Sequence, residues 1–260
     1  YRSKPHCGGQ GVYVRHLSRE LCGLGHHVEV FSGQPYPELD PGPVLREVPS
    51  LDLYRDDDPF RTPRWGEYRD WADVLETTMM WGGAFPEPLT FSIRALRVLA
   101  ERAGEFDVVH DNQGLGYGML GVRRLGLPLV TSIHHPISVD KRIDLASSGK
   151  LAALNKRRWY GFVRMQARVA RRLAGTGPLI TVSESSRDDI CRDFEIDVGV
   201  FRTANLRLAA LIEEEKQQVE VATTEDVAQA LEAEEGEADR SHVRAFLRDR
   251  LAGAEIPFEV

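Results

Sequence analysis

Apolar side chains recur at helical spacing directly after the glycine-rich stretch "GGQG", at Val14, Leu17, Leu21 and Leu24. Gly25 then provides a stop, so this spacing predicts a helix. The run "HHVEVFSG", residues 26–33, is rich in β-branched residues and predicts a short strand after the helix. Glycine turn, helix and strand together make most of a βαβ unit, but its first strand is not visible in the sequence.

Three later apolar runs predict strands that alternate with helices. They are "FDVVHD", "LPLVTSIHH" and "GPLITVSES", at residues 106–111, 127–135 and 177–185. Helical periodicity covers about residues 67–80, 90–103, 115–125 and 150–173, and a short strand is expected near "LREVPS" in a proline-rich loop. Continuous apolar strands between helices are typical of a mostly parallel sheet with helices on both faces. We therefore predict an α/β fold.

Each of these three strands ends in polar residues, namely His110, Asp111 and Asn112, then His134 and His135, then Ser183, Glu184 and Ser185. In an open parallel sheet the carboxyl ends of the strands form one edge, and ligands bind there. We expect the three polar clusters to converge on that edge. The glycine turn, formed by Gly8, Gly9, Gln10 and Gly11, is expected to join them.

Two interpretations stay open for the glycine turn and for the histidine pair. The turn can bind a phosphate or a sugar through N–H groups at a helix N-terminus, or it can be only a tight turn. His134 and His135 stand before Pro136 and can bind a hydroxyl or phosphate, act as a base, or bond a loop carbonyl. We favour a functional role for the pair because strand-end loops carry function in such sheets. A metal site is not expected, since no third ligand lies at a familiar spacing.

Two helix-associated segments also have two interpretations each. "VSESSRDDI" predicts a strand that runs into a capped helix, with Ser183 or Ser185 as the N-cap, and such a helix end can also contact an anion. The predicted helix 150–173 carries eight Lys/Arg and no acidic residue. We interpret it as a core-facing helix with a solvated basic back, and keep contact with an anionic acceptor or a membrane surface as the less favoured alternative.

Composition places the chain among globular proteins and divides it in two. Its 260 residues are 42% apolar and 28% charged, with neither a long apolar run nor a basic-then-apolar leader. Cys7, Cys22 and Cys191 form no paired framework, so we expect reduced thiols and a cytoplasmic location. Residues 205–260 carry fourteen Asp/Glu against six Lys/Arg, whereas the preceding residues have 26 against 27. This asymmetry predicts a boundary near residue 203 and an acidic helical tail, 204–260.

Four segments taken in order resemble the N-terminal half of family 4 glycosyltransferases. They are "GGQGVYVRHLSRELCGLGHHVEVFSG", "FDVVHDNQGLGYGMLG", "LPLVTSIHHP" and "LITVSESSRDDI", spread over about residues 5–196. The resemblance implies one half of a GT-B enzyme, in which two Rossmann-like domains flank a cleft. It implies metal-independent, retaining transfer of a sugar from a nucleotide-sugar donor to a hydroxyl acceptor. It also implies that the glycine turn lies near the donor phosphates and the acceptor, that His134 lies at the acceptor side near the reaction centre, and that Ser183 faces the cleft.

The sequence departs from the family pattern at both ends of the matching region. Family members have an apolar first strand before the glycine turn and, after a hinge, a second domain that binds the donor. Here no such strand precedes the turn, and "DVGVFRT" resembles the hinge only weakly. We therefore expect residues 1–203 to be an incomplete acceptor-side domain that is inactive alone. Its expected partners are the two substrates and either a missing second domain or another copy bound through an open sheet edge, with no cofactor and no nucleic acid.

Two other functions remain as alternatives. The first is a non-catalytic remnant that binds an acceptor or a partner but transfers nothing. The second is a Rossmann oxidoreductase that uses the glycine turn for NAD. We disfavour it because the glycine spacing differs from the dinucleotide fingerprint and no acidic residue ends "HHVEVFSG" to bind the ribose.

Overall fold

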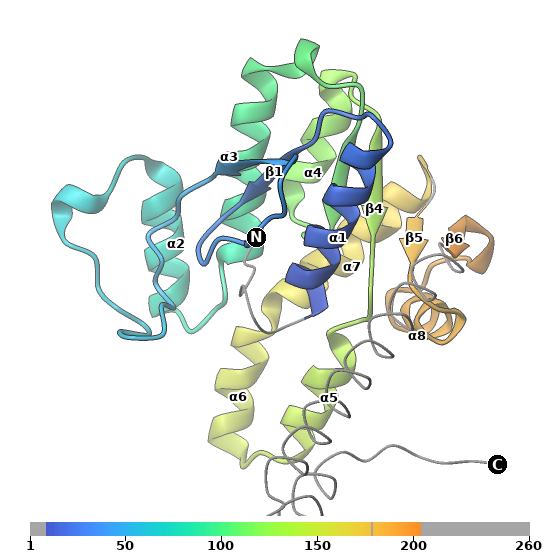
Figure 1. Ribbon diagram of the computed structural model, residues 1–260. Coiled ribbons are helices and arrows are strands. Elements are labelled where there is room, and N and C mark those ends of the chain that lie inside the picture. The colour runs from blue at the N-terminus through green and yellow to red at the C-terminus, as the bar shows by residue number, and fades with distance from the viewer. Residues whose placement is uncertain (1–8, 178, 204–260) are drawn as a thin grey trace, which may run out of the picture. The chain divides into compact units, whose positions relative to one another are not determined.

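The computed structural model describes residues 9–177 and 179–203 (Figure 1). The predicted acidic tail and its boundary lie at or beyond the end of these residues, and Gly8 precedes them. The helices are α1 (Gly9–Gly23), α2 (Trp71–Trp81), α3 (Glu87–Glu101), α4 (Tyr117–Val122), α5 (Ser138–Ala146), α6 (Lys150–Trp159), α7 (Gly161–Ala174) and α8 (Glu184–Phe194). The strands are β1 (Glu29–Ser32), β2 (Val44–Glu47), β3 (Val109–Asn112), β4 (Leu129–Ser132), β5 (Leu179–Thr181) and β6 (Phe201–Thr203). Short 3₁₀ turns occupy Trp65–Glu67, Ala103–Glu105, Arg123–Leu125 and Val198–Val200.

The strands of the described residues form two parallel sheets. β1 pairs with β2, and β3, β4, β5 and β6 follow one another in a four-stranded sheet. A helix stands between each pair of successive strands in the larger sheet, as parallel connections require. The predicted α/β fold with parallel strands is confirmed, and within the described residues its strands are divided between two sheets.

The two faces of the four-stranded sheet differ in burial, because side chains alternate along each strand. Thr131, Ile133 and Leu179 are buried, and the latter two belong to a core that includes residues of α7 and α8. On the opposite face His110 is exposed and His134 is only half-buried. α1 lies against this second face, in front of β4 in Figure 1. The sheet therefore has one face that packs on the apolar core and one face toward α1 that carries His110 and His134.

The basic segment after β4 forms two helices, and the prediction of one helix over 150–173 was wrong. α6 ends at Trp159 and α7 begins at Gly161, with Tyr160 between them at ψ 14°. The Tyr160 hydroxyl donates to Asp144 Oδ2 of α5 at 2.6 Å, so a side-chain contact holds the break in place. α5 itself was not predicted.

The predicted apolar stripe of this segment holds in α7 only. Met165, Val169 and Leu173 are buried in the core, whereas Leu154 of α6 is exposed. The core-facing interpretation is therefore confirmed for α7. No helix in residues 9–177 and 179–203 is both long and apolar enough to span a membrane. Contact with a membrane surface stays the less favoured alternative.

Side chains attach the β1–β2 pair to the rest of the fold. Glu29, whose side chain is 3% exposed, accepts hydrogen bonds from Arg46 and Arg102, each at 2.8 Å. These guanidinium groups hold the pKa of Glu29 far below its ordinary value. The ring of Phe31 on β1 also packs edge-on against Phe106, with 5.9 Å between centroids. A charged clamp and an aromatic contact thus join the two sheets.

Candidate functional site

Two diagonal hydrogen bonds connect the polar ends of β3 and β4. His110 Nε2 lies 2.7 Å from Ser132 Oγ, and His134 Nε2 lies 2.6 Å from Asn112 Oδ1. Asn112 is in register with Ser132, so each pair is offset by two residues along the strands. Residues two apart on a strand share a face, and all four therefore lie on the face toward α1. The predicted convergence of the first two polar clusters is confirmed.

Gln113 holds the end of β4 in place with its side-chain amide. Its Oε1 accepts from the His134 N–H at 2.9 Å, and its Nε2 donates to the His135 carbonyl at 2.8 Å. The residue is buried and has a φ of 54°. Gln166 of α7, also buried, donates to the Gln113 carbonyl at 3.4 Å. Sequence analysis missed both glutamines, and the only available signals were a polar residue after a strand and one within an apolar helix stripe.

Asp111 was predicted to bind substrate, but in the structure its carboxylate accepts hydrogen bonds from backbone N–H groups. Oδ1 accepts from Gly114 N at 3.0 Å and Oδ2 accepts from Leu115 N at 2.9 Å. Burial raises the pKa of this carboxyl group above its ordinary value. A Cβ on Gly114 would lie 2.5 Å from Asp111 Oδ1, so the loop needs glycine there. Asp111 therefore shapes the loop that positions Gln113.

His134 is a neutral imidazole with one nitrogen available as an acceptor. Burial, together with the nearby His135 and His110, lowers its pKa to about 4. With Asn112 Oδ1 as its partner, Nε2 carries the hydrogen, so Nδ1 has the lone pair. Such a ring can accept a hydrogen bond from a hydroxyl at neutral pH, but its low pKa makes it a weak base.

Gly9, Gln10 and Gly11 are part of α1, and the prediction that these residues form a turn before the helix was wrong. α1 begins at Gly9, so Gln10 and Gly11 lie in its first turn, while Gly8 lies outside the described residues. The first N–H groups of any helix lack acceptors within it, so this end still offers backbone donors. Tyr13, in the next turn, packs its ring edge-on against His134, with 4.5 Å between centroids. The first turns of α1 therefore lie beside the β4 end, and binding by Gly9, Gln10 and Gly11 stays a prediction.

The third predicted cluster forms the start of α8. Ser183 is the N-cap, and its Oγ accepts from Ser186 N at 3.1 Å, which confirms the predicted cap. Glu184 and Ser185 are exposed on the first helical turn. β5 pairs directly with β4, so this helix start follows the strand next to that of His134. The hydrogen bonds of Ser183 Oγ go to Ser186, and a role of this cluster in binding stays a prediction.

The described residues can offer hydrogen bonds to a ligand more readily than metal ligands. In the part of the chain that the structure describes, no group of three His, Cys, Asp or Glu side chains could hold a metal ion. Instead, α1 lies beside the imidazole of His134, through the ring contact of Tyr13. Such an arrangement suits a polar ligand that carries hydroxyl or phosphate groups.

A model of the Glycosyltransferase Family 4 domain matches residues 7–201, which include β1 to β5 and the first residue of β6. The chain belongs to glycosyltransferase family 4. The resemblance inferred from the four sequence segments is thereby confirmed, and the sheet face that carries His110 and His134 lies inside the matched region.

Three curated relatives of this family 4 chain have transferase names. An "MMP alpha-(1->4)-mannosyltransferase" of Mycolicibacterium hassiacum is 58% identical over 197 residues, which are 75% of this chain and 47% of that protein. A "D-inositol 3-phosphate glycosyltransferase" of Thermobispora bispora is 31% identical over 55% of this chain and 30% of its own length. The protein of the same name from Frankia alni is 33% identical over 49% of this chain and 28% of its own length. The chain thus spans less than half the length of each of these relatives.

Acid is expected to destabilise the family 4 chain through His134. Its pKa is about 4 in the folded state and about 6.5 in an unfolded chain. Between these values the unfolded state binds the proton, so the stabilising contribution is complete above pH 6.5 and is lost as pH falls toward 4. His134→Gln should reduce the drop in unfolding free energy between pH 7 and pH 5 by about 2 kcal/mol, measured by urea unfolding. The exposed His26 provides the control, since His26→Gln should leave the drop in unfolding free energy unchanged. An equal drop in His134→Gln and wild type would contradict the low pKa of His134.

Proposed function

We propose that this chain forms the acceptor side of a glycosyltransferase that moves a sugar from a nucleotide-sugar donor to a hydroxyl group of an acceptor, with retention of configuration. The family match over residues 7–201 and the 58% identical mannosyltransferase support this proposal. The single observation that carries it is the neutral His134 beside Asn112 and Tyr13, at the carboxyl end of a parallel strand.

In the proposed reaction His134 positions a substrate hydroxyl. Its Nδ1 accepts the hydrogen bond while Asn112 fixes the ring through Nε2. Gln113 holds the backbone on both sides of the ring and so fixes where Nδ1 points. The backbone donors at the start of α1 would contact an anionic part of a substrate. Orientation and stabilisation of the leaving diphosphate would then supply most of the rate acceleration.

We further propose that the donor contacts lie in the part of such an enzyme that the match does not cover. The matched residues make up 47% of the length of the mannosyltransferase. Retaining transfer of this kind needs the diphosphate to be held by charged groups in a largely dry cleft. The 260-residue polypeptide would then have no transferase activity by itself.

The test compares this polypeptide with a chimera. The chimera joins residues 9–203 to the part of the Mycolicibacterium hassiacum mannosyltransferase that lies outside the match. Both are incubated with a panel of nucleotide sugars and sugar acceptors, and released nucleoside diphosphate and glycosylated product are measured. We expect product from the chimera only. A chimera that folds and binds donor but forms no product would support a non-catalytic role and overturn the proposal.

A further inference from the structure

A small pocket lies beside the carboxyl ends of β1 and β2, apart from the His134 cluster. Gln34 follows β1 and Ser50 follows β2, and both line the pocket together with Glu76 of α2 and Thr90 and Arg94 of α3. Its volume is about 10 Å³, which is room for one water-sized group. Gln34 and Ser50 are half-buried, whereas Glu76, Thr90 and Arg94 are buried.

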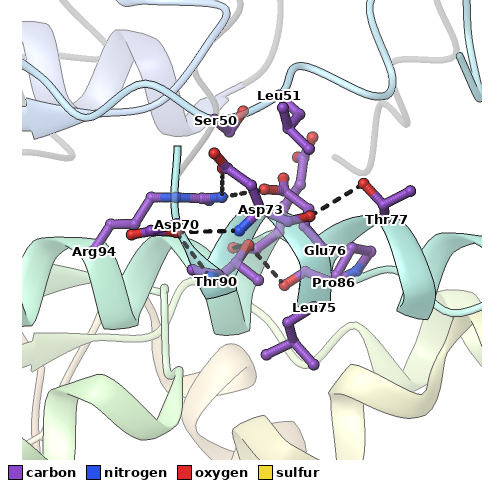
Figure 2. A network of polar contacts seen from close by, with 12 residues as sticks. Ser50, Leu51, Asp70, Asp73, Leu75, Glu76, Thr77, Pro86, Thr90 and Arg94 are labelled. Atoms are coloured by element: carbon purple, nitrogen blue, oxygen red, sulfur yellow. Dashed lines mark hydrogen bonds and ion pairs between the residues drawn. The ribbon is translucent and has the colours of Figure 1, made fainter. Parts of the chain in front are cut away.

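Three buried charged side chains line this pocket, namely Glu76, Glu87 and Arg94, and Glu76 and Arg94 are joined in one ion-pair network. Figure 2 shows the network: Arg94 Nη2 donates to Glu76 Oε2 and, at 2.6 Å, to Asp73 Oδ1. Glu76 is completely buried and the Arg94 side chain is 9% exposed. Glu76 Oε1 and Arg94 Nη1 are buried and have no hydrogen-bond partner among the described residues. Leaving such groups unsatisfied costs free energy, so each calls for a partner.

Only some chemical groups can satisfy both atoms at once. An anion would accept from Arg94 Nη1 but would be repelled by the Glu76 carboxylate. An amine would donate to Glu76 but has no lone pair for Arg94 once it is charged. A hydroxyl oxygen can donate to Glu76 Oε1 and accept from Arg94 Nη1. Burial raises the pKa of Glu76, and a hydroxyl can pair with its protonated form as well, by accepting instead of donating.

The pocket lies on the side of the fold where open parallel sheets bind ligands, since two of its walls follow strand ends. α3 also connects it to the loop after β3. Ser92, which follows the pocket-lining Phe91, accepts through Oγ from Gly118 N of α4 at 3.1 Å. A Cβ on Gly116 would lie 2.2 Å from Ser92 Oγ, so the loop and α3 are in close contact. The same loop contains Gln113, which holds His134.

We propose that Glu76 and Arg94 bind one hydroxyl group of the sugar acceptor, which displaces a water molecule from this pocket. The proposal rests on the proposed function and names the subsite that would select the acceptor. In this role Glu76 accepts the hydroxyl hydrogen and Arg94 Nη1 donates to its oxygen. The remaining part of the sugar would lie toward the half-buried Gln34 and Ser50.

The test measures binding of methyl α-mannoside, methyl α-glucoside and myo-inositol to the 260-residue chain by NMR titration. Glu76→Gln places an amide donor where the hydroxyl must donate, and Arg94→Lys removes Nη1 but keeps the charge. Each variant should raise the Kd of the bound sugar about tenfold to a hundredfold, which is the effect of losing a hydrogen bond to a charged group. Arg97→Lys is the matched control, because Arg97 lies on the same helix and pairs with Asp70 but does not line the pocket, and it should leave binding unchanged. Thermal unfolding checks that each variant folds.

Monodeoxy analogues of the bound sugar make the assignment specific. The analogue that lacks the contacting hydroxyl should bind wild type as weakly as the parent sugar binds Glu76→Gln. The Glu76→Gln variant should bind this analogue and the parent sugar equally well. If no sugar binds wild type, or if no analogue shows this coupling to Glu76, the pocket holds water only and the proposal is overturned. Coupled sugar binding together with an inactive chimera would leave this subsite supported and overturn the proposed function alone.

Discussion

Replacing His134 with alanine in the chimera is expected to lower kcat/KM roughly a hundredfold, which is the typical consequence of losing precise substrate orientation. The substitution removes Nδ1, the acceptor that faces the substrate in our proposal, and also the ring contact with Tyr13. Because Gln113 binds the backbone of this segment, the strand end should keep its position. Steady-state transfer assays measure the loss, and circular dichroism checks the fold.

His135 is the matched control for this experiment. It is adjacent to His134 and its side chain is exposed, while its carbonyl accepts from Gln113. His135→Ala keeps that carbonyl and should change kcat/KM far less than His134→Ala does. If kcat/KM fell more in His135→Ala than in His134→Ala, His135 would be the residue that positions the substrate. That result would contradict the geometry at the end of β4. Asn112→Ala should give an intermediate loss, because the ring would keep Nδ1 but lose the partner that fixes its tautomer.

Replacing Arg94 with methionine is expected to destabilise the chain by about 3–5 kcal/mol, the usual cost of removing one partner from a buried ion pair. Glu76 would then be a completely buried carboxylate without its guanidinium. Asp73 would lose one of its two arginine partners and keep Arg69. Urea unfolding at pH 7 measures the loss. At lower pH the deficit should shrink, since protonation of Glu76 removes the uncompensated charge.

Arg97 provides the comparison for this prediction. It lies on the same helix, pairs with the partly exposed Asp70 and is itself 38% exposed. Arg97→Met should cost at most about 1 kcal/mol, as exposed pairs do. If Arg94→Met were no more costly than Arg97→Met, the carboxylates of Asp73 and Glu76 would not depend on Arg94. Replacing Asp73, Glu76 and Arg94 together by apolar residues should restore most of the stability.

The sequence allowed prediction of the strands and of their polar ends, because both are local patterns. Each apolar run became a parallel strand, and Ser183 caps the following helix as its neighbours indicated. The break at Tyr160 was missed because it depends on a hydrogen bond to Asp144 in a separate helix. α5 was missed because its sequence, "SVDKRIDLA", has few apolar positions to reveal a period.

Roles of buried polar residues could not be predicted from spacing alone. Asp111 looked like a ligand-binding residue at a strand end, yet its carboxylate accepts from two backbone amides. Gln113 was not considered, although it makes the contacts that fix His134. Glu76 and Arg94 resemble ordinary surface charges of amphipathic helices, and only tertiary packing shows that they are buried. Pairing between residues far apart in sequence decides these roles.

The attachment of β1–β2 by side chains has a consequence for hydrogen exchange. No backbone ladder in the described residues joins this pair to β3–β6. The hydrogen bonds between β1 and β2 can therefore break, and their amide hydrogens exchange, while the larger sheet stays intact. We expect the two sheets to open as separate cooperative units, coupled by the Glu29–Arg102 clamp and the Phe31–Phe106 contact. A sugar held between Ser50, which follows β2, and Arg94 of α3 would add a further coupling between the units. Ligand binding would thus be visible as slower exchange in a sheet that contributes no strand to the His134 cluster.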